Sequence, residues 1–425
     1  MKKISSILTI IIALSLILCG CSSGNGHNDD TSTNTENTTD PSAVVLDDTV
    51  YRWSLTSKNK IMISVDKIIH ILDKNDENAK PECFCRVSGC DHTDSECTAH
   101  IGLLYPIIID SGETSVMYWT HRPIRTQIED QERLAEMEDV LGSAIRYAGA
   151  MYKYDLNTGE RSLVAELLPF VDNPDFYYNG KIYMDASLDD IRTHNTGVTE
   201  KQYKTVFCID AATGDYSYLD IGRNAVPIGI YGEKLYFSDA ETYYDMTSEK
   251  EVTITDGKIY AASLDLSEYE IYTEIDFSYD KSFSSDGIFY FHDTDTSSVF
   301  ALDMSKGETE LKKITEKTGF VSIYSTDGNL YWCEKDKRTI TYGDREYTIG
   351  SKNIIYCYDS KTGETKEISG KDLKYDYSAI EYADEDEIVF FGYYYGDFEK
   401  TGNLVKGYWQ YSFETNEIKE LYVYE

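Results

Sequence analysis

Basic residues are scarce in this sequence: 40 Lys and Arg stand against 75 Asp and Glu, which gives a formal net charge of −35. A protein that binds nucleic acid needs a basic surface to neutralise phosphates, so this charge balance excludes that class. We interpret the acidity as a solvated surface that keeps the chain soluble. Attraction for cationic ligands is the alternative interpretation.

Catalytic motifs are also missing. The sequence contains no His-Glu-x-x-His pair, no Gly-x-Ser-x-Gly turn and no phosphate-binding Walker loop. Acidic pairs are abundant, but 75 carboxylates produce such clusters by chance. Glycosidases also need a set separation of two carboxylates in space, which a sequence does not specify. These absences favour a binding protein over an enzyme.

Long apolar runs are limited to the N-terminus. Two lysines precede an apolar stretch, Ile7 to Leu18, that is short for a hydrocarbon core of about 30 Å. A small residue, Gly20, then precedes Cys21. This order is typical of an export signal, with a transmembrane anchor as the alternative. The ending resembles the lipobox of bacterial lipoproteins, which implies that Cys21 carries a lipid such as palmitate.

We therefore expect residues 1–20 to be a lipoprotein signal peptide and the mature chain to be extracytoplasmic, anchored to the cell membrane. Residues 22–42 are mostly Ser, Thr, Asn, Asp and Gly, without an apolar period. Such a composition cannot bury a core, so residues 21–44 are expected to form a disordered linker. The remaining residues, 45–425, have a globular composition and form the domain to be explained.

Tyrosine is abundant, with 37 residues in the chain. It suits half-buried strand positions, where the ring packs and the hydroxyl reaches a partner, so its abundance predicts sheet. One repeated pattern is a strand that ends in an Asp turn, as in Val206 to Asp210 followed by Ala-Ala-Thr-Gly-Asp. Asp begins such a turn, Gly supplies a positive φ, and the next strand follows. With weaker copies, the turns centre on positions 73, 155, 210, 265, 303, 359 and 412.

A second pattern is a turn that leads into an aromatic strand, as in Asn179-Gly180-Lys181-Ile182-Tyr183. Each such strand precedes one Asp-turn strand. Seven units of roughly fifty residues, each with about four strands, predict an all-β fold, a β-propeller with seven blades. Six or eight blades are possible counts, and a double β-sandwich is the alternative architecture.

Ile124 to Gly142 has an amphipathic helical pattern, so we expect one helical insertion there, as a cap on a blade edge or as a lid. The strand Tyr118-Trp119-Thr120 and its counterparts resemble the YWTD-type propeller repeat. The ensemble also resembles a family of extracellular propeller lipoproteins from Gram-positive bacteria. The resemblance covers about residues 45–425 and implies a propeller tethered to the cell surface.

Four of the nine cysteines lie within fifteen residues, with His92 among them: Cys83, Cys85, Cys90 and Cys97. Cys85, Cys90, His92 and Cys97 are a complete tetrahedral set for one structural zinc ion, which leaves Cys83 outside. Two disulfides among the four cysteines are the alternative in an oxidising compartment, and they leave His92 without a role. The Cys-x4-Cys-x-His-x4-Cys spacing resembles a recurrent element of the same lipoprotein family, but the resemblance supplies no role for it.

Two tyrosine runs are candidate ligand-binding residues, because aromatic rings suit a sugar or a peptide: Tyr393, Tyr394 and Tyr395, and Tyr243 with Tyr244. Packing at strand edges is the alternative. We hypothesise a lipid-anchored cell-surface β-propeller that binds or scaffolds an unknown glycan, peptide or protein ligand. The other hypotheses are an extracellular glycan hydrolase or lyase, and an accessory subunit of a surface complex or transporter.

Overall fold

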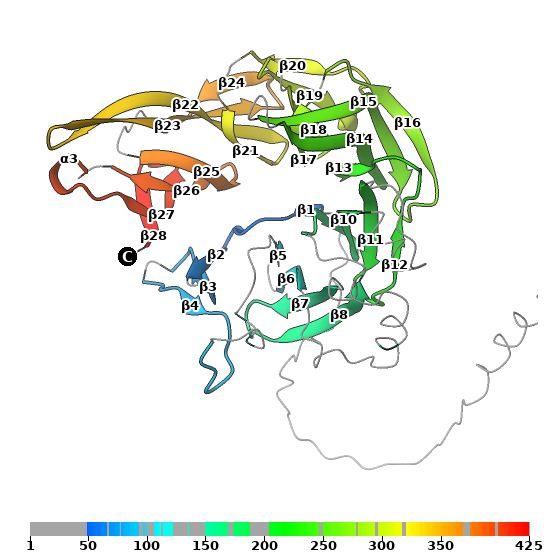
Figure 1. The fold of residues 1–425 in the computed structure, drawn as a ribbon, viewed down its shortest axis with the longest axis horizontal. Helices are drawn as coiled ribbons and strands as arrows, with labels where there is room; N and C mark the ends of the chain where they lie inside the picture. The colour runs from blue at the N-terminus through cyan, green and yellow to red at the C-terminus, as the bar shows by residue number, and fades with distance from the viewer. Residues whose placement is uncertain are drawn as a thin grey trace, which may run out of the picture. The chain divides into compact units, whose positions relative to one another are not determined.

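Each sheet of the fold is a meander of antiparallel strands that follow one another in the chain. The computed structural model describes residues 49–65, 68–76, 78–92, 97, 99, 106–111, 114–121, 135, 149–168, 173–187, 204–245, 250–277, 279–293, 296–316, 320–368, 375–395 and 398–424. These residues form seven sheets around a common centre, the blades of a β-propeller (Figure 1). The prediction of an all-β propeller with seven blades is confirmed.

The blades are numbered in chain order. Blade 1 contains β2 (Lys60–Val65), β3 (Ile68–Asp73) and β4 (Glu82–Cys83). Blade 2 contains β5 (Ile107–Ser111), β6 (Thr114–His121), β7 (Gly149–Asp155) and β8 (Arg161–Leu168). Blade 3 contains β9 (Phe176–Tyr178), β10 (Lys181–Ser187), β11 (Lys204–Asp210) and β12 (Tyr216–Tyr218), and β1 (Tyr51–Arg52) joins its inner edge.

The later blades have four strands each. Blade 4 contains β13 (Val226–Tyr231), β14 (Lys234–Asp245), β15 (Lys250–Ser263) and β16 (Tyr269–Glu274). Blade 5 contains β17 (Tyr279–Ser285), β18 (Ile288–Asp293), β19 (Val299–Asp303) and β20 (Lys312–Thr315). Blade 6 contains β21 (Phe320–Thr326), β22 (Asn329–Tyr342), β23 (Arg345–Asp359) and β24 (Glu364–Glu367), and blade 7 contains β25 (Tyr375–Ala383), β26 (Glu387–Tyr394), β27 (Val405–Ser412) and β28 (Ile418–Val423).

Helix is rare in the described part of the chain: beside the single helical residue Ala135, it comprises η3 (Met304–Lys306) and α3 (Phe398–Thr401). The helical insertion expected at residues 124–142 lies outside the described residues, apart from Ala135, and stays a prediction. None of the described helices has the length and apolar character that a membrane span needs.

The Asp turns connect the third strand of a blade to its fourth. The Oδ1 of Asp155 accepts hydrogen bonds from the backbone N–H groups of Asn157 and Thr158, both at 2.8 Å. Asp210 and Asp359 accept equivalent bonds, so the repeated residues share one structure. The first and second strands meet at hairpins such as Asn179-Gly180, where both φ angles are positive, 43° and 80°. These turns therefore have the local chemistry that the two sequence patterns predict.

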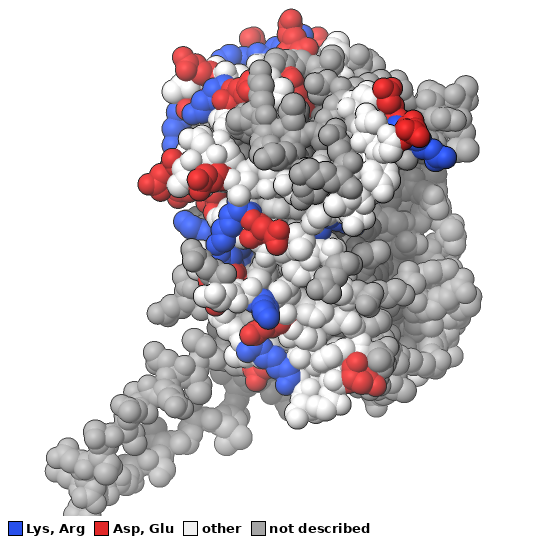
Figure 2. All heavy atoms as spheres, turned by 90° about the vertical axis from the view of Figure 1, so that its left-hand side faces the viewer, with Lys and Arg blue, Asp and Glu red and all other residues white. Residues whose placement is uncertain are grey.

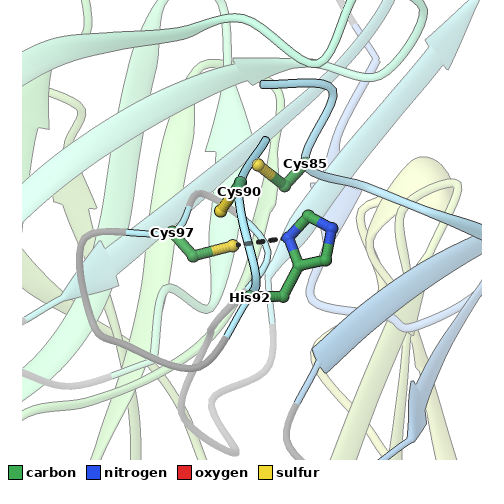
Figure 3. Close-up of side chains that lie close together, drawn as sticks. All are labelled: Cys85, Cys90, His92 and Cys97. Carbon is green, nitrogen blue, oxygen red and sulfur yellow. Dashed lines mark hydrogen bonds between the residues drawn. The ribbon is translucent and has the colours of Figure 1, made fainter. Parts of the chain in front are cut away.

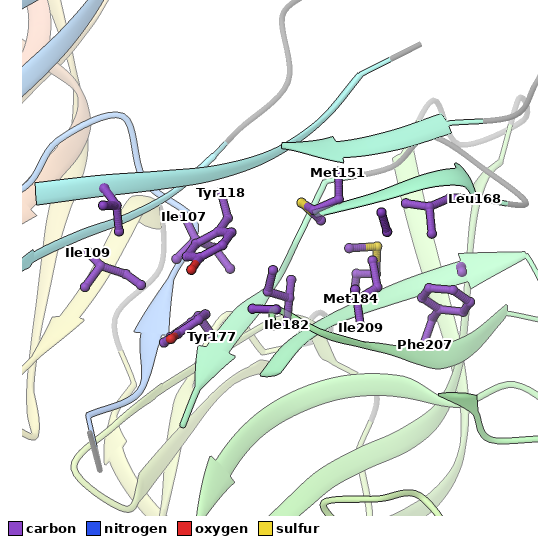
Figure 4. Close-up of a cluster of buried hydrophobic side chains, with 14 residues drawn as sticks. Ile107, Ile109, Tyr118, Met151, Leu168, Tyr177, Ile182, Met184, Phe207 and Ile209 are labelled. Carbon is purple, nitrogen blue, oxygen red and sulfur yellow. The ribbon is translucent and has the colours of Figure 1, made fainter. Parts of the chain in front are cut away.

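The aromatic second strands supply the packing between blades. The described residues form seven hydrophobic clusters, one for each pair of neighbouring blades, including one between blades 7 and 1. In the cluster between blades 2 and 3, Tyr118 of β6 stacks on Tyr177 of β9 with ring centroids 5.2 Å apart (Figure 4). Burial of this apolar surface, roughly 25 cal/mol for each Å², is what holds consecutive blades together.

The chain enters the propeller across the inner edges of three blades. Tyr51 pairs with Tyr177 of blade 3, and the N–H of Ser54 then donates to the carbonyl of Pro106 beside β5 of blade 2, at 2.9 Å. The N–H of Met62 in β2 donates to the carbonyl of Leu55 at 2.8 Å. The entering segment therefore takes the place of an innermost strand in blade 1.

Candidate metal centre

Four side chains converge in the loop that follows β4. The ligand atoms of Cys85, Cys90, His92 and Cys97 all lie within 4.8 Å of one another. Figure 3 shows the three thiols and the imidazole pointing toward one another, with His92 Nδ1 3.2 Å from Cys97 Sγ. Three sulfurs and one imidazole nitrogen form a complete tetrahedral donor set, so this cluster could hold a metal ion.

The loop takes the place of an outer strand of blade 1. β4 is only two residues long, yet β3 has further partners: Phe84 N–H donates to the Ile69 carbonyl at 2.9 Å, and Ile69 N–H donates to the Ala99 carbonyl at 2.8 Å. The side chains of Phe84, Cys85, Cys97 and Ala99 are buried in the cluster between blades 1 and 2. The four candidate ligands therefore lie in a part of the core that has few regular strand contacts of its own.

The surroundings of two glycines independently support the placement of the cysteine loop at the outer edge of blade 1. In blade 3, a Cβ on Gly214 would lie 2.3 Å from the carbonyl oxygen of Val164 in the outer strand β8 of blade 2. In blade 2, the corresponding Gly159 faces the carbonyl oxygen of Phe84, which would lie 2.9 Å from such a Cβ. Phe84 thus occupies in blade 1 the position that Val164 occupies in blade 2.

Backbone geometry brings the ligands together. Cys90 N–H donates to the Val87 carbonyl at 3.2 Å, which closes a turn containing Gly89 at φ 80°. His92 has φ 59°, a conformation that costs energy for a residue with a Cβ and that concentrates at functional sites. Ala99 N–H lies 3.4 Å from Cys97 Sγ, where it can donate to a thiolate. Such outer contacts orient metal ligands.

Cys83 is outside the set of four ligands, although it interacts with Cys85 and Cys90. It pairs with His70 in the β3–β4 ladder, and burial raises the pKa of its thiol. It lines a cavity of about 270 Å³ together with Asp73, Glu82 and Arg86. None of the described cysteines, Cys83, Cys85, Cys90, Cys97, Cys208, Cys333 and Cys357, forms a disulfide in this structure. The geometry therefore separates the Cys3His set from the fourth cysteine of the loop.

The other predicted site residues are not gathered in one cluster. Tyr393 and Tyr394 end β26 in blade 7, and Tyr394 packs on Tyr375 with ring centroids 5.1 Å apart, while Tyr395 is buried. Tyr243 and Tyr244 lie on β14 in blade 4, opposite Val252 and Glu251. The side chains of Tyr243 and Tyr244 are outside the described residues, as is the whole of Cys21, so these assignments stay predictions.

Two charged residues at the inner edges of the blades were missed by the sequence analysis. Arg52 lies on β1, and Glu381 lies on the inner strand β25. Neither belongs to a repeated motif. Their positions depend on the crossing of the N-terminal segment and on a β-bulge, and neither feature has a signal in the sequence.

Comparisons with known proteins assign no family to the chain. No protein-family profile matches the chain, and no curated protein matches it. Among solved structures, the chain is similar to the acylaminoacyl peptidase of Pyrococcus horikoshii, with 14% identity, a TM-score of 0.46, and coverage of 88% of this chain and 52% of that chain. It is also similar to an oligogalacturonate lyase from Vibrio parahaemolyticus, with 11% identity and a TM-score of 0.41. That match covers 85% of this chain and 90% of that chain.

A third similar structure is the β-propeller domain of the Trilobed protease from Pyrococcus furiosus. It has 10% identity and a TM-score of 0.41, and the match covers 88% of this chain and 96% of that chain. At these identities and TM-scores, the three matches carry no information on activity.

Proposed function

We propose that this chain is a lipid-anchored, extracytoplasmic β-propeller that acts as a binding or scaffolding module, with one structural zinc ion in its Cys3His cluster. The observation that carries the binding role is a pair of hairpin arms. β14 and β15 continue to pair beyond a register shift at Ser238, as far as Asp245 opposite Lys250. β22 and β23 do the same beyond Glu334, as far as Tyr342 opposite Arg345.

Both arms extend from the same face of the ring, because both connect a second strand to a third strand. The tight Asp turns and the two-residue hairpins lie at the opposite face. At the tip of the blade 6 arm, Tyr342 packs on Phe398 of α3 with centroids 5.7 Å apart, and α3 belongs to the corresponding connection of blade 7. Tyr342 and Leu404 remain 41% and 44% exposed, so this face offers apolar contact area to a ligand or partner.

The zinc assignment rests on the donor set. A filled Cys3His site leaves no open coordination position, so the ion would supply folding energy rather than catalysis. That role fits a loop that takes the place of an outer strand and is packed between two blades.

The lipid anchor is proposed from the sequence before and at Cys21. Figure 2 shows one side of the propeller, where the described Lys and Arg side chains are interspersed with Asp and Glu.

An arm-shortened variant tests the binding role. Residues 337–350 of the blade 6 arm are replaced by an Asn-Gly turn, which leaves the part of β22 and β23 that belongs to the blade. Full-length protein is screened on glycan and peptide arrays. We expect binding without turnover, and loss of that binding in the shortened variant at an unchanged melting temperature. Binding that persists after removal of the arm contradicts the assignment to this face, and reproducible product formation contradicts a pure binding role.

A further inference from the structure

Arg52 is a half-buried cation that forms no salt bridge with the described residues. It pairs with Phe176 across β1 and β9, and its guanidinium carbon lies 5.2 Å from the centroid of that ring and 5.8 Å from that of Phe283 in blade 5. Burial lowers the pKa of Arg52, and the negative charge of Asp175 opposes that effect. Asp175 Oδ2 itself accepts a hydrogen bond from the backbone N–H of Asp185 at 2.8 Å.

Glu381 is the opposite case, a carboxylate at the inner edge of blade 7. It is the extra residue of a β-bulge, because Ile380 pairs with Phe390 and Tyr382 pairs with Val389, which leaves Glu381 without a partner across the ladder. Bulges re-aim side chains and are frequent beside functional sites. Among the described residues, no side chain donates a hydrogen bond to its carboxylate, and burial raises the pKa of Glu381 to about 7.

The two groups belong to one neighbourhood. Ser54 follows Arg52 by two residues in the entering segment, and its Oγ lies 3.4 Å from the Glu381 carbonyl oxygen. Tyr324 of blade 6 interacts with both: burial raises the pKa of its hydroxyl, Arg52 lowers it, and Asp384, Asp327 and Glu381 raise it. A guanidinium and a carboxylate that are both half-buried and yet not paired with each other lose part of their hydration without gaining an ion pair. Such groups are typical of sites where a ligand completes the pairing.

We infer that the inner edges of blades 3, 5, 6 and 7 bind a small zwitterion, an amino acid or a short peptide, whose carboxylate pairs with Arg52 and whose ammonium group pairs with Glu381. A planar guanidinium matches a carboxylate with two parallel hydrogen bonds, and the two Phe rings hold it in place. This inner-edge site, defined by Arg52, Tyr324 and Glu381, is separate from the hairpin arms and the cysteine loop. The inference therefore goes beyond the binding role proposed for the arms.

Calorimetry on the detergent-solubilised full-length protein tests the inference with four probes. Glycine and the dipeptide Ala-Ala carry both charges, acetate carries only the anion, and methylammonium carries only the cation. We expect at least one zwitterion to bind at least tenfold more tightly than acetate or methylammonium. Arg52→Gln should weaken zwitterion and acetate binding at least tenfold, whereas Glu381→Gln should weaken zwitterion binding and leave acetate binding unchanged.

Arg161→Gln is the matched control, because Arg161 also lies over an aromatic ring, that of Tyr152 at 4.7 Å, but on the outer strand β8. It should change no affinity. Arg52→Lys keeps the positive charge but loses the planar guanidinium. It should weaken acetate binding at least threefold. This variant tests the role of Arg52 if Arg52→Gln fails to fold. Failure of both zwitterions to bind, or equal affinities in the wild type and a folded Arg52 variant, overturns the inference. If shortening the blade 6 arm abolishes zwitterion binding, the ligand does not bind at the inner-edge site. That result would overturn the inference and support the binding role proposed for the arms.

Discussion

Lys74 Nζ lies 2.7 Å from Glu387 Oε1, and this ion pair joins the first blade of the propeller to the last across 313 residues of sequence. The Lys74 side chain is only 1% exposed, and its ammonium lies 4.3 Å from the centroid of Tyr382. None of the described sheets combines strands from the two ends of the chain. Closure of the ring therefore depends on this pair and on the hydrophobic cluster between blades 7 and 1.

Lys74→Met should destabilise the protein by about 3 kcal/mol, because it leaves the Glu387 carboxylate, 17% exposed, without its cation. The double variant Lys74→Met/Glu387→Gln should recover part of that loss, since it removes the unpaired charge. Equilibrium urea unfolding measures both values. As a control, Lys204→Met removes an ion pair to Asp185 from a side chain that is 58% exposed, and should cost less than about 1 kcal/mol. Equal losses in the two single variants would contradict a closing role for Lys74.

The repeat could be predicted from the sequence because its chemistry is local. Asp155 accepts hydrogen bonds from residues two and three positions later, and Asn179-Gly180 reverses the chain within two residues. Such turns are specified by the residues that form them. Seven copies then determine the number of blades without any knowledge of distant contacts.

The parts that could not be predicted depend on contacts between distant residues. Nothing near Lys74 in the sequence points to Glu387, and nothing near Arg52 points to the inner edges of blades 3 and 5. Glu381 owes its position to a bulge, and a shift of one residue in a strand moves a side chain to the other face. The Cys3His set is intermediate: its short spacing predicted the cluster, but the replacement of an outer strand by its loop became visible only in the packed structure.

The cysteine loop allows a direct test of zinc against disulfides. Purified protein should carry about one equivalent of zinc, and Cys90→Ser should remove most of it, because three donors remain. Cys83→Ser is the matched control in the same loop and should leave the metal content unchanged, since Cys83 is outside the ligand set. Elemental analysis by mass spectrometry gives the stoichiometry.

Chelator and reductant should act differently on the same loop. Metal binding and loop folding share one free energy, so chelator should increase hydrogen exchange at residues 84–92, and reductant should not. An unreduced mass that is lower by about four hydrogens, with no metal present, would establish two disulfides and remove the zinc assignment.

The contact between consecutive blades at the Asp turn should be sensitive to one methyl group. Gly214→Ala places a Cβ 2.3 Å from the Val164 carbonyl oxygen, in addition to the strain of φ 75°. Gly222→Ala is the matched control, because its φ is 70° and nothing lies within 4 Å of a Cβ. We expect a loss of about 1 kcal/mol for Gly222→Ala and a further loss of about 1–3 kcal/mol for Gly214→Ala in urea unfolding. Similar losses in both variants would show that the blades are not packed in this way.

Glu381 should make the stability of the protein depend on pH in an unusual direction. Burial raises the pKa of Glu381 from 4.5 to about 7. Between these values the folded state binds more protons at this residue than the unfolded state does. The contribution of Glu381 to stability is therefore greatest in acid and is lost as the pH rises toward 7. Tyr324 and Tyr424 interact with it, and burial raises the pKa of both, so neither titrates in this window.

Glu381→Gln removes this titration. Relative to the wild type, the variant should gain stability as the pH rises from 4 to 8, by at most about 3 kcal/mol. The control is Glu270→Gln on β16, where a hydrogen bond from Lys234 lowers the pKa of Glu270. That contribution is present at neutral pH and lost in acid, so the control variant should become relatively less stable as the pH rises. Urea unfolding at pH 4, 6 and 8 distinguishes the two, and a pH-independent effect of Glu381→Gln would show that its carboxyl is solvated like an ordinary surface group.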